Sequence, residues 1–212
     1  MQSMKRVLFI VALCFMCLAS ACKNNKPHTV LFDGSNLLGW NSVLDTKESP
    51  ASVVDVFSIE NGNLRVSGQP YGYIYTEEQY ENYRLHAEWR WVGEGSNSGI
   101  FLHIQYPDIV WPKAIECQLC SGKAGDMVML GGAKIFDIEC VGEFPIKQRY
   151  GDFEKSVGEW NEADIVCDGR QIKIYINGEL ANECTTLRGK GYIALQSEGG
   201  PIEFRNITLS EL

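Results

Sequence analysis

Short runs of β-branched and aromatic residues, separated by two-residue turn signals, constrain the fold more than any other feature of this sequence. Asn61-Gly62, Asp168-Gly169 and Asn177-Gly178 each stand between or beside such runs. Asn-Gly and Asp-Gly pairs tolerate the positive φ angles that a two-residue β-hairpin requires. The sequence therefore predicts antiparallel strands joined by tight turns from Val30 onward.

Strand-like alternation of apolar and polar residues recurs along the body of the chain. It is clearest in residues 83–91, 99–105, 114–120, 133–140, 163–167, 171–176, 192–198 and 202–209. Only residues 76–82 and 124–130 suggest helical turns. Ten or more strands in about 185 residues cannot remain one flat sheet, and the usual solution is two sheets packed face to face. We expect an all-β, two-sheet jelly-roll sandwich.

The first 21 residues have the pattern of a targeting peptide. Lys5 and Arg6 precede an apolar run at 7–18, which is too short to span a bilayer. Small residues then lead into Cys22, as in a bacterial lipoprotein signal that is cleaved before an acylated cysteine. An ordinary secretory signal cut after Ala21 is the alternative. We expect a signal peptide at 1–21, a polar tether at 22–28 and one β-sandwich domain at 29–212, held in the cell envelope and facing the periplasm or the outer surface.

Charge and cysteine content narrow the classes of partner. The chain has 19 basic and 27 acidic residues, a net charge of −8, and we find no cluster of Lys and Arg. Such a domain is poorly suited to phosphate backbones, so nucleic acid is not an expected partner. Beyond Cys22 there are five cysteines, an odd number that cannot all pair within the fold. Cys117-x-x-Cys120 lies in a strand-like run, where buried or paired thiols are the alternative to a metal or redox site.

Polar residues gather on single faces of several predicted strands, since residues two apart in a strand share a face. These sets are His86, Glu88 and Arg90; Phe101, His103 and Gln105; Glu116 and Gln118; and Gln196 and Glu198. Carboxylates, amides and guanidinium groups hydrogen-bond sugar hydroxyls, and aromatic rings stack on sugar faces. The sets favour a carbohydrate site, and simple solvated sheet faces are the alternative.

An ordered series of short motifs resembles a known family. The series comprises LFDGSNLLGW at 31–40, YIYT at 73–76, YRL at 83–85, NSGIFLH at 97–103, IECQ at 115–118, GEWN at 158–161, IALQSEG at 193–199 and FRNI at 204–207. In this order it is similar to the 3-keto-disaccharide hydrolase domain family of exported bacterial proteins. The resemblance implies a concanavalin A-like jelly roll. It also implies a glycoside substrate whose 3-hydroxyl a separate sugar 3-dehydrogenase has oxidised to a ketone.

A 3-keto sugar can be cleaved with few catalytic groups. Retaining glucanases on this fold carry Glu-x-Asp-x-Glu on one strand, whereas Glu116-x-Gln118 supplies a single carboxylate. The ketone acidifies the C2 proton, so one base can start an elimination that releases the aglycone from C1. We expect Glu116 to be this base and Glu198 or His103 to protonate the leaving oxygen. His86 is a further candidate acid.

The remaining candidate residues would bind substrate. Gln118, together with Arg90 or His103, would stabilise the enolate oxygen, and Glu88 would support Arg90 or His86. The full expected substrate-binding set is Gln118, Arg90, His86, Glu88, Asn97, Gln196, Trp160 and Arg205.

Three alternatives remain open from sequence. A divalent cation held by Glu88, His86, His103 and Glu116 could polarise the ketone. A non-catalytic, lectin-like lipoprotein could instead bind sugar through stacking platforms at Trp40, Trp111, Trp160, Tyr71 and Tyr73. A structural envelope protein would have no pocket.

Overall fold

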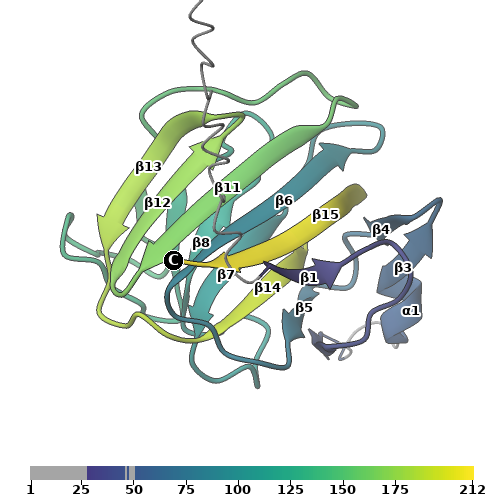
Figure 1. Cartoon of the computed structure of the whole chain (residues 1–212), viewed down its shortest axis with the longest axis horizontal. Coiled ribbons are helices and arrows are strands. Elements are labelled where there is room, and N and C mark those ends of the chain that lie inside the picture. Colours follow the sequence, from purple (N-terminus) through teal and green to yellow (C-terminus); the bar gives the residue numbers. More distant parts are fainter. Residues whose placement is uncertain (1–27, 46, 48–50) are drawn as a thin grey trace, which may run out of the picture.

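Two antiparallel β-sheets packed face to face make up the computed structural model (Figure 1). The structure describes residues 28–45, 47 and 51–212. The predicted all-β, two-sheet sandwich is therefore confirmed. The signal peptide, Cys22 and most of the predicted tether lie outside the described residues, and His28 already belongs to the first strand.

The first sheet, which faces the viewer in Figure 1, has the strand order β13-β12-β11-β6-β15-β4-β3, and β1 pairs with β15. Its strands are β1 (His28–Phe32), β3 (Phe57–Glu60), β4 (Asn63–Val66), β6 (Tyr83–Trp91), β11 (Asn161–Asp168), β12 (Gln171–Ile176), β13 (Glu179–Thr185) and β15 (Ile202–Glu211).

The second sheet lies behind the first in this view and has the order β10-β9-β8-β7-β14-β5-β2. Its strands are β2 (Trp40–Leu44), β5 (Gly72–Thr76), β7 (Gly99–Ile104), β8 (Ala114–Gln118), β9 (Met127–Leu130), β10 (Ile146–Lys147) and β14 (Tyr192–Ser197). Non-consecutive neighbours such as β7 and β14 bring distant parts of the chain together in one sheet.

The predicted hairpin turns are present. Asn61 and Asn177 have φ angles of 51° and 52°, and Gly169 has a φ angle of 55°. These residues join β3 to β4, β12 to β13 and β11 to β12. The left-handed conformation is one that Asn and Gly reach at little cost, which explains why the turns form there.

Both predicted helical turns are wrong. Thr76 ends β5 and residues 77–82 form bends with an isolated bridge at Tyr80, whereas 127–130 form β9, whose four residues are all buried beside β8. An unbroken apolar run fits a buried strand as well as a short helix, so periodicity could not separate the two. Within the described residues, the only helix is α1 (Val53–Val56), and none is long and apolar enough to cross a membrane.

The main core lies between the sheets. Leu85, Ala87, Trp89 and Trp91 alternate along the inner face of β6, as the sequence predicts, and all are buried. Strands of the second sheet contribute alternate residues to the same core, among them Ile115 of β8. A smaller apolar cluster covers part of the outer face of the second sheet, built from Tyr73, Phe101, Ile104, Ala114, Val128, Leu130 and Ala194. The candidate site lies beside this second cluster.

Candidate functional site

Glu116 occupies the middle of β8 and faces away from the main core. Its neighbours Ile115 and Cys117 point into that core, so alternation turns Glu116 to the outer face, opposite Phe101 on β7. The residue is only 2% exposed, and its Oε1 has no hydrogen-bond partner. Burial, with a smaller contribution from the Glu198 charge, raises the pKa of Glu116 well above its usual range. The proton is therefore harder to remove from Glu116 than from an exposed glutamate.

Glu198 follows β14 and reaches the same hollow from the other side of β7. Gln196 Nε2 donates a hydrogen bond to Glu198 Oε2 at 2.8 Å, and the backbones of Asn97 and Glu198 form an isolated bridge. Burial raises the pKa of Glu198, whereas hydrogen bonds from Asn97 and Gln196 oppose that rise. The two carboxyl groups therefore differ in their hydrogen-bonded environment, because donors stabilise the charge on Glu198 and no donor faces Glu116 Oε1.

One cavity of about 330 Å³ joins these groups. Glu116 and Gln118 line it from β8, and Asn97 and Glu198 line it from the opposite side. The volume is in the range of small-ligand pockets. Gln118 Oε1 accepts a hydrogen bond from the backbone N–H of Cys120 at 2.9 Å. This contact fixes the orientation of the amide and leaves its Nε2 group as the donor.

Two residues that line this cavity carry buried acceptors without a partner. Among the described residues, eight buried side-chain polar atoms lack a partner, and two of them, Asn97 Oδ1 and Glu116 Oε1, belong to residues that line this cavity; Gln196, which was predicted to bind substrate, does not line it. A buried acceptor without a donor costs free energy, so native sites that keep several of them usually receive donors from a ligand. Hydroxyl groups of a sugar are donors of this kind.

An aromatic wall completes the cavity. Trp111 and Phe144 lie edge to face with ring centroids 6.0 Å apart, and Glu143 and Ile146 lie beside them. Sequence reasoning missed Glu143 and Phe144, because they lie in a loop where no alternation marks a face. Trp111 was expected only as a stacking platform for a binding protein, and the other four platforms do not line this cavity.

Five predicted site residues lie elsewhere. His86, Glu88 and Arg90 are on the outer face of β6, and Trp160 and Arg205 lie beside them, on the far side of the sandwich from Glu116. Alternation correctly predicted one face of the strand, but it could not show that β6 and β8 belong to different sheets. These residues therefore cannot share a pocket with Glu116, which corrects the predicted binding set.

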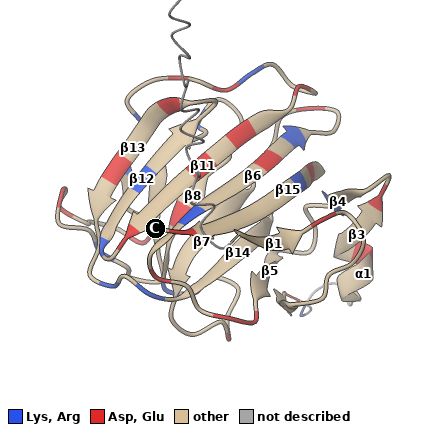
Figure 2. Ribbon diagram, in the orientation of Figure 1, with Lys and Arg blue, Asp and Glu red and all other residues tan. Residues whose placement is uncertain are grey.

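The outer-face residues instead satisfy one another. Arg205 binds Glu88 through Nε and Nη2, at 2.7 and 2.6 Å, and its guanidinium carbon lies 3.9 Å from the centre of the Trp160 ring. Arg90 lies over the same ring and binds Glu203 at 2.8 and 2.7 Å. Figure 2 shows that acidic and basic positions are interspersed along the strands of this sheet. The arrangement is a charge network that covers the face of a sheet.

The prediction that His103 shares the outer face with Phe101 is wrong, because β7 contains a bulge. Tyr192 pairs with Ile104 and Ala194 pairs with Phe101, so β7 has one extra residue there, and His103 takes a φ angle of 57°. The extra residue shifts the alternation. Ile104 therefore joins Phe101 on the outer face, and His103 packs against the core residue Tyr83, with ring centroids 6.3 Å apart.

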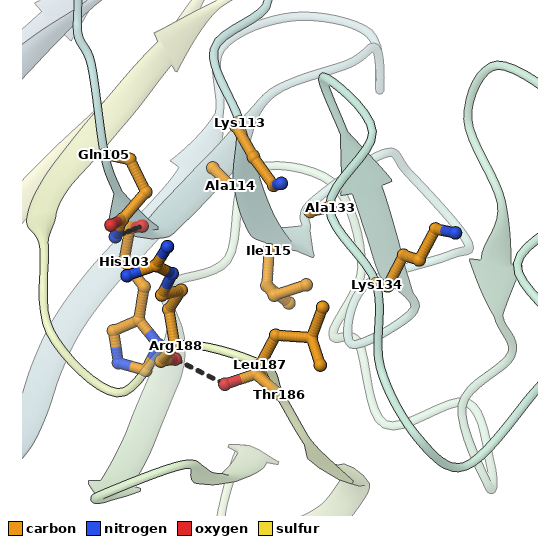
Figure 3. A pocket seen from close by; sticks show the side chains of 10 residues that line it. All are labelled: His103, Gln105, Lys113, Ala114, Ile115, Ala133, Lys134, Thr186, Leu187 and Arg188. Atoms are coloured by element: carbon orange, nitrogen blue, oxygen red, sulfur yellow. Dashed lines mark hydrogen bonds between the residues drawn. The ribbon is translucent and has the colours of Figure 1, made fainter.

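The cavity beside His103 does not suit a sugar. His103 lines it with Lys113 and Arg188, and Figure 3 shows the Thr186 hydroxyl donating to the Arg188 carbonyl at its lower side. Its volume is about 30 Å³, close to that of a single water molecule. His103 is therefore removed from the candidate catalytic set.

The proposed cation set is likewise dispersed. Glu88 and His86 are on the first sheet, His103 packs in the interior and Glu116 faces the cavity, so these four cannot surround one ion. A search of the described residues finds no group of three or more His, Cys, Asp or Glu side chains placed to hold a metal. The five described cysteines are free thiols, and Cys117 points into the core, where burial raises its pKa.

Comparison with family models decides the affiliation of the chain. A model described as the 3-keto-alpha-glucoside-1,2-lyase-like domain matches residues 27–210. The chain belongs to this family. Membership in the lyase-like domain family supports a carbohydrate-active function and confirms the resemblance found in the sequence.

Several solved structures of carbohydrate-related proteins have the same fold as this lyase-like domain. Two crystal structures of candidate glycosyl hydrolases from Parabacteroides distasonis each give a TM-score of 0.65. One is 24% identical and is matched over 88% of this chain and 100% of its own; the other is 18% identical, with 87% and 94% covered. Carbohydrate-binding module CBM66 from Bacillus subtilis gives a TM-score of 0.61 at 10% identity, with 82% and 96% covered. Comparison with curated proteins found no match.

Proposed function

We propose that this domain cleaves the glycosidic bond of 3-keto-glycosides by elimination, using Glu116 and Glu198 as a carboxyl pair. The observation that carries the proposal is the convergence of two unequal carboxyl groups with Gln118 and Asn97 on one cavity. The Glu-x-Asp-x-Glu strand that retaining glucanases use for direct displacement places its two catalytic glutamates four positions apart, and Cys120 stands four positions after Glu116.

The reaction needs one base and one acid. The base removes the proton from C2, which the 3-ketone makes acidic, and the resulting enolate expels the aglycone by breaking the C1–O bond. The acid gives its proton to the departing oxygen, so that an enone and a free aglycone are formed. Water can then add to the enone, with net hydrolysis as the result. Gln118 Nε2 supports the negative charge on the 3-oxygen.

The donors around each carboxyl group assign the two roles. In this proposal Glu198, whose charged form Asn97 and Gln196 stabilise by hydrogen bonds, acts as the base, and Glu116, whose pKa burial raises well above its usual range, acts as the acid. This reverses the sequence-based hypothesis, which made Glu116 the base. The reversal follows from contacts around the side chains, which the spacing of residues could not reveal.

Substrates with different leaving groups test the assignment. Glu198→Gln should lower kcat/KM at least about a hundredfold on every 3-keto-glucoside, because proton removal fails. Glu116→Gln should show the same loss with an alkyl aglycone and at most a tenfold loss with 4-nitrophenol, which leaves without an acid. The matched unoxidised glucosides serve as controls and should not be cleaved. Equal losses for both variants on both aglycones would contradict the division of roles, and turnover of the unoxidised sugars would contradict 3-keto specificity.

A non-catalytic carbohydrate-binding role is the second candidate. The aromatic wall of Trp111 and Phe144, together with the fold shared with a carbohydrate-binding module, favours it. A binding module would retain an unoxidised glycan with measurable affinity and release no product from a 3-keto-glycoside. Isothermal titration with both sugars, followed by product analysis, separates the two functions.

The cellular setting is a further part of the proposal. The pattern before Cys22 supports an acylated, envelope-held protein that receives its substrate from a sugar 3-dehydrogenase. Mass spectrometry of the mature N-terminus should find diacylglycerol on Cys22, and Cys22→Ser should release the protein from membranes. An unmodified N-terminus at Cys22 would leave the ordinary secretory signal as the explanation.

A further inference from the structure

Gly99 lies directly beneath the Glu116 carboxyl group. It is the first residue of β7 and pairs with Gln118 on β8. A Cβ atom added to Gly99 would lie 2.0 Å from Glu116 Oε1, 2.8 Å from its Cδ and 2.9 Å from its Cγ. All three distances are shorter than real Cβ contacts, so any side chain here would displace the Glu116 carboxyl group.

The backbone itself does not require glycine at this position. Gly99 is not among the residues with positive φ angles, so its backbone conformation is open to other residues. Most other glycines of the chain, such as Gly62 and Gly178, have positive φ angles and stand in turns. The need for glycine at 99 therefore comes from the carboxyl group above it.

The surroundings of Glu116 explain why its carboxyl group lies over Gly99. Phe101 stands directly opposite Glu116 across the β7–β8 pair and fills that position with a buried ring. Gly99 is two residues before Phe101 on the same face, so the missing side chain leaves a recess next to the ring. The carboxyl group enters this recess and becomes almost fully buried.

We infer that Gly99 is a positioning residue, whose recess keeps the Glu116 carboxyl group buried, protonated and turned toward the cavity that it shares with Glu198. The catalytic consequence rests on the proposed function, in which Glu116 is the acid. With a side chain at 99, the carboxyl group would move toward solvent in the cavity, where ionisation is easier. The acid would then lose its proton at a lower pH.

A double-mutant cycle tests the contact without any activity assay. Gly99→Ala should lower the urea midpoint of the wild-type protein and have little effect in a Glu116→Ala background, where the recess is vacant. Gly151→Ala is the matched control, because the atoms nearest to its added Cβ belong to the ring of Phe153, which does not line the cavity. Should Gly99→Ala fail to fold, folding of the double variant would support the contact. An equal loss in both backgrounds, or unfolding of both, would overturn it.

The pH profile tests the positioning role. Gly99→Ala should move the alkaline limb of kcat/KM for an alkyl 3-keto-glucoside to lower pH by at least about one unit, with kcat reduced about tenfold or more. An unchanged alkaline limb would overturn the inference, since a purely structural defect lowers activity at all pH values. If the wild-type protein fails to cleave 3-keto-glycosides, the proposed function fails. The stability cycle and a ¹³C NMR titration of the Glu116 carboxyl group then still decide the role of Gly99.

Discussion

At the scale of single residues, two buried titratable side chains tie the stability of the domain to pH in opposite senses. Glu116 is buried as a neutral acid, and its pKa lies far above that of an unfolded glutamate. His103 is 3% exposed, and burial lowers its pKa to about 4. The burial of Glu116 therefore lowers stability as the pH rises above its unfolded pKa, and the burial of His103 lowers stability as the pH falls below its unfolded pKa.

Glu116→Gln should stabilise the protein increasingly as the pH rises. Above about pH 4.5 the folded state holds a proton on Glu116 that the unfolded state has lost, so wild-type stability falls by up to about 1.4 kcal/mol per pH unit until the folded pKa is reached. Glutamine removes this slope. Urea midpoints of both proteins between pH 5 and 8 measure it, and parallel curves would show that Glu116 is ionised in the folded protein.

His103→Asn should flatten the acid side of the same curve. Between pH 6.5 and about 4 the unfolded imidazole binds a proton and the folded one does not. Wild-type stability should therefore fall as the pH decreases, by about 3 kcal/mol over this window. Asparagine accepts the φ angle of 57° at this position and does not titrate. A retained acid slope in the variant would assign it to other groups.

At the scale of the strands, the bulge in β7 and the outer face of β6 decide which side chains can meet the substrate. One extra residue in β7 directs His103 inward, and membership of the first sheet carries Arg90 and Trp160 to the far side of the molecule. Arg90 and Trp160, which were expected to contact sugar, therefore stabilise a sheet surface instead. Their removal should affect folding and leave the chemistry intact.

Trp160→Leu should lower the free energy of unfolding by about 1 kcal/mol, because both Arg90 and Arg205 lose their cation–π contact with the Trp160 ring. The kcat/KM for a 3-keto-glucoside should stay within about twofold of wild type. Phe144→Leu, which changes the cavity wall, is the paired control and should raise KM. A large loss of turnover in Trp160→Leu at unchanged stability would return this residue to the substrate site.

Strand patterns therefore predict more of the fold than of the site. The hairpin at Asn177-Gly178 and the inward face of β6 were predicted correctly, since local φ preferences and alternation determine them. Glu116, Gln118, Asn97 and Glu198 were named from sequence and do line one cavity. The pairing order of strands, the bulge at His103 and the loop that carries Phe144 depend on tertiary contacts that no local pattern records.

At the scale of the whole molecule, acidic residues outnumber basic ones both in the chain and in the cavity lining. The net charge is −8, and besides the buried Glu116 the described cavity lining contains Glu143 and Glu198 and no Lys, Arg or His residue. Charged groups of the same sign as the lining are repelled, most strongly where water is excluded. The site should therefore prefer uncharged glycosides.

A matched pair of aglycones tests this preference. The 3-keto-glucoside of methyl 4-hydroxybenzoate should have a KM at least about fivefold lower than that of the free 4-hydroxybenzoate compound, whose carboxylate faces the acidic lining. Added salt should narrow the gap, since screening weakens repulsion between exposed charges. Equal KM values at low salt would indicate that the aglycone lies outside the field of these carboxylates.

The cavity draws its two halves from different kinds of structure. Its carboxyl and amide groups come largely from paired strands or their immediate ends, whereas Trp111 and Phe144 are carried by connecting segments. Connecting segments accept insertions and substitutions far more readily than hydrogen-bonded strands do. Exchange of these two segments between relatives would therefore alter the aromatic wall and leave the carboxyl and amide groups in place, so that, under the proposed function, aglycone preference and bond cleavage could change independently.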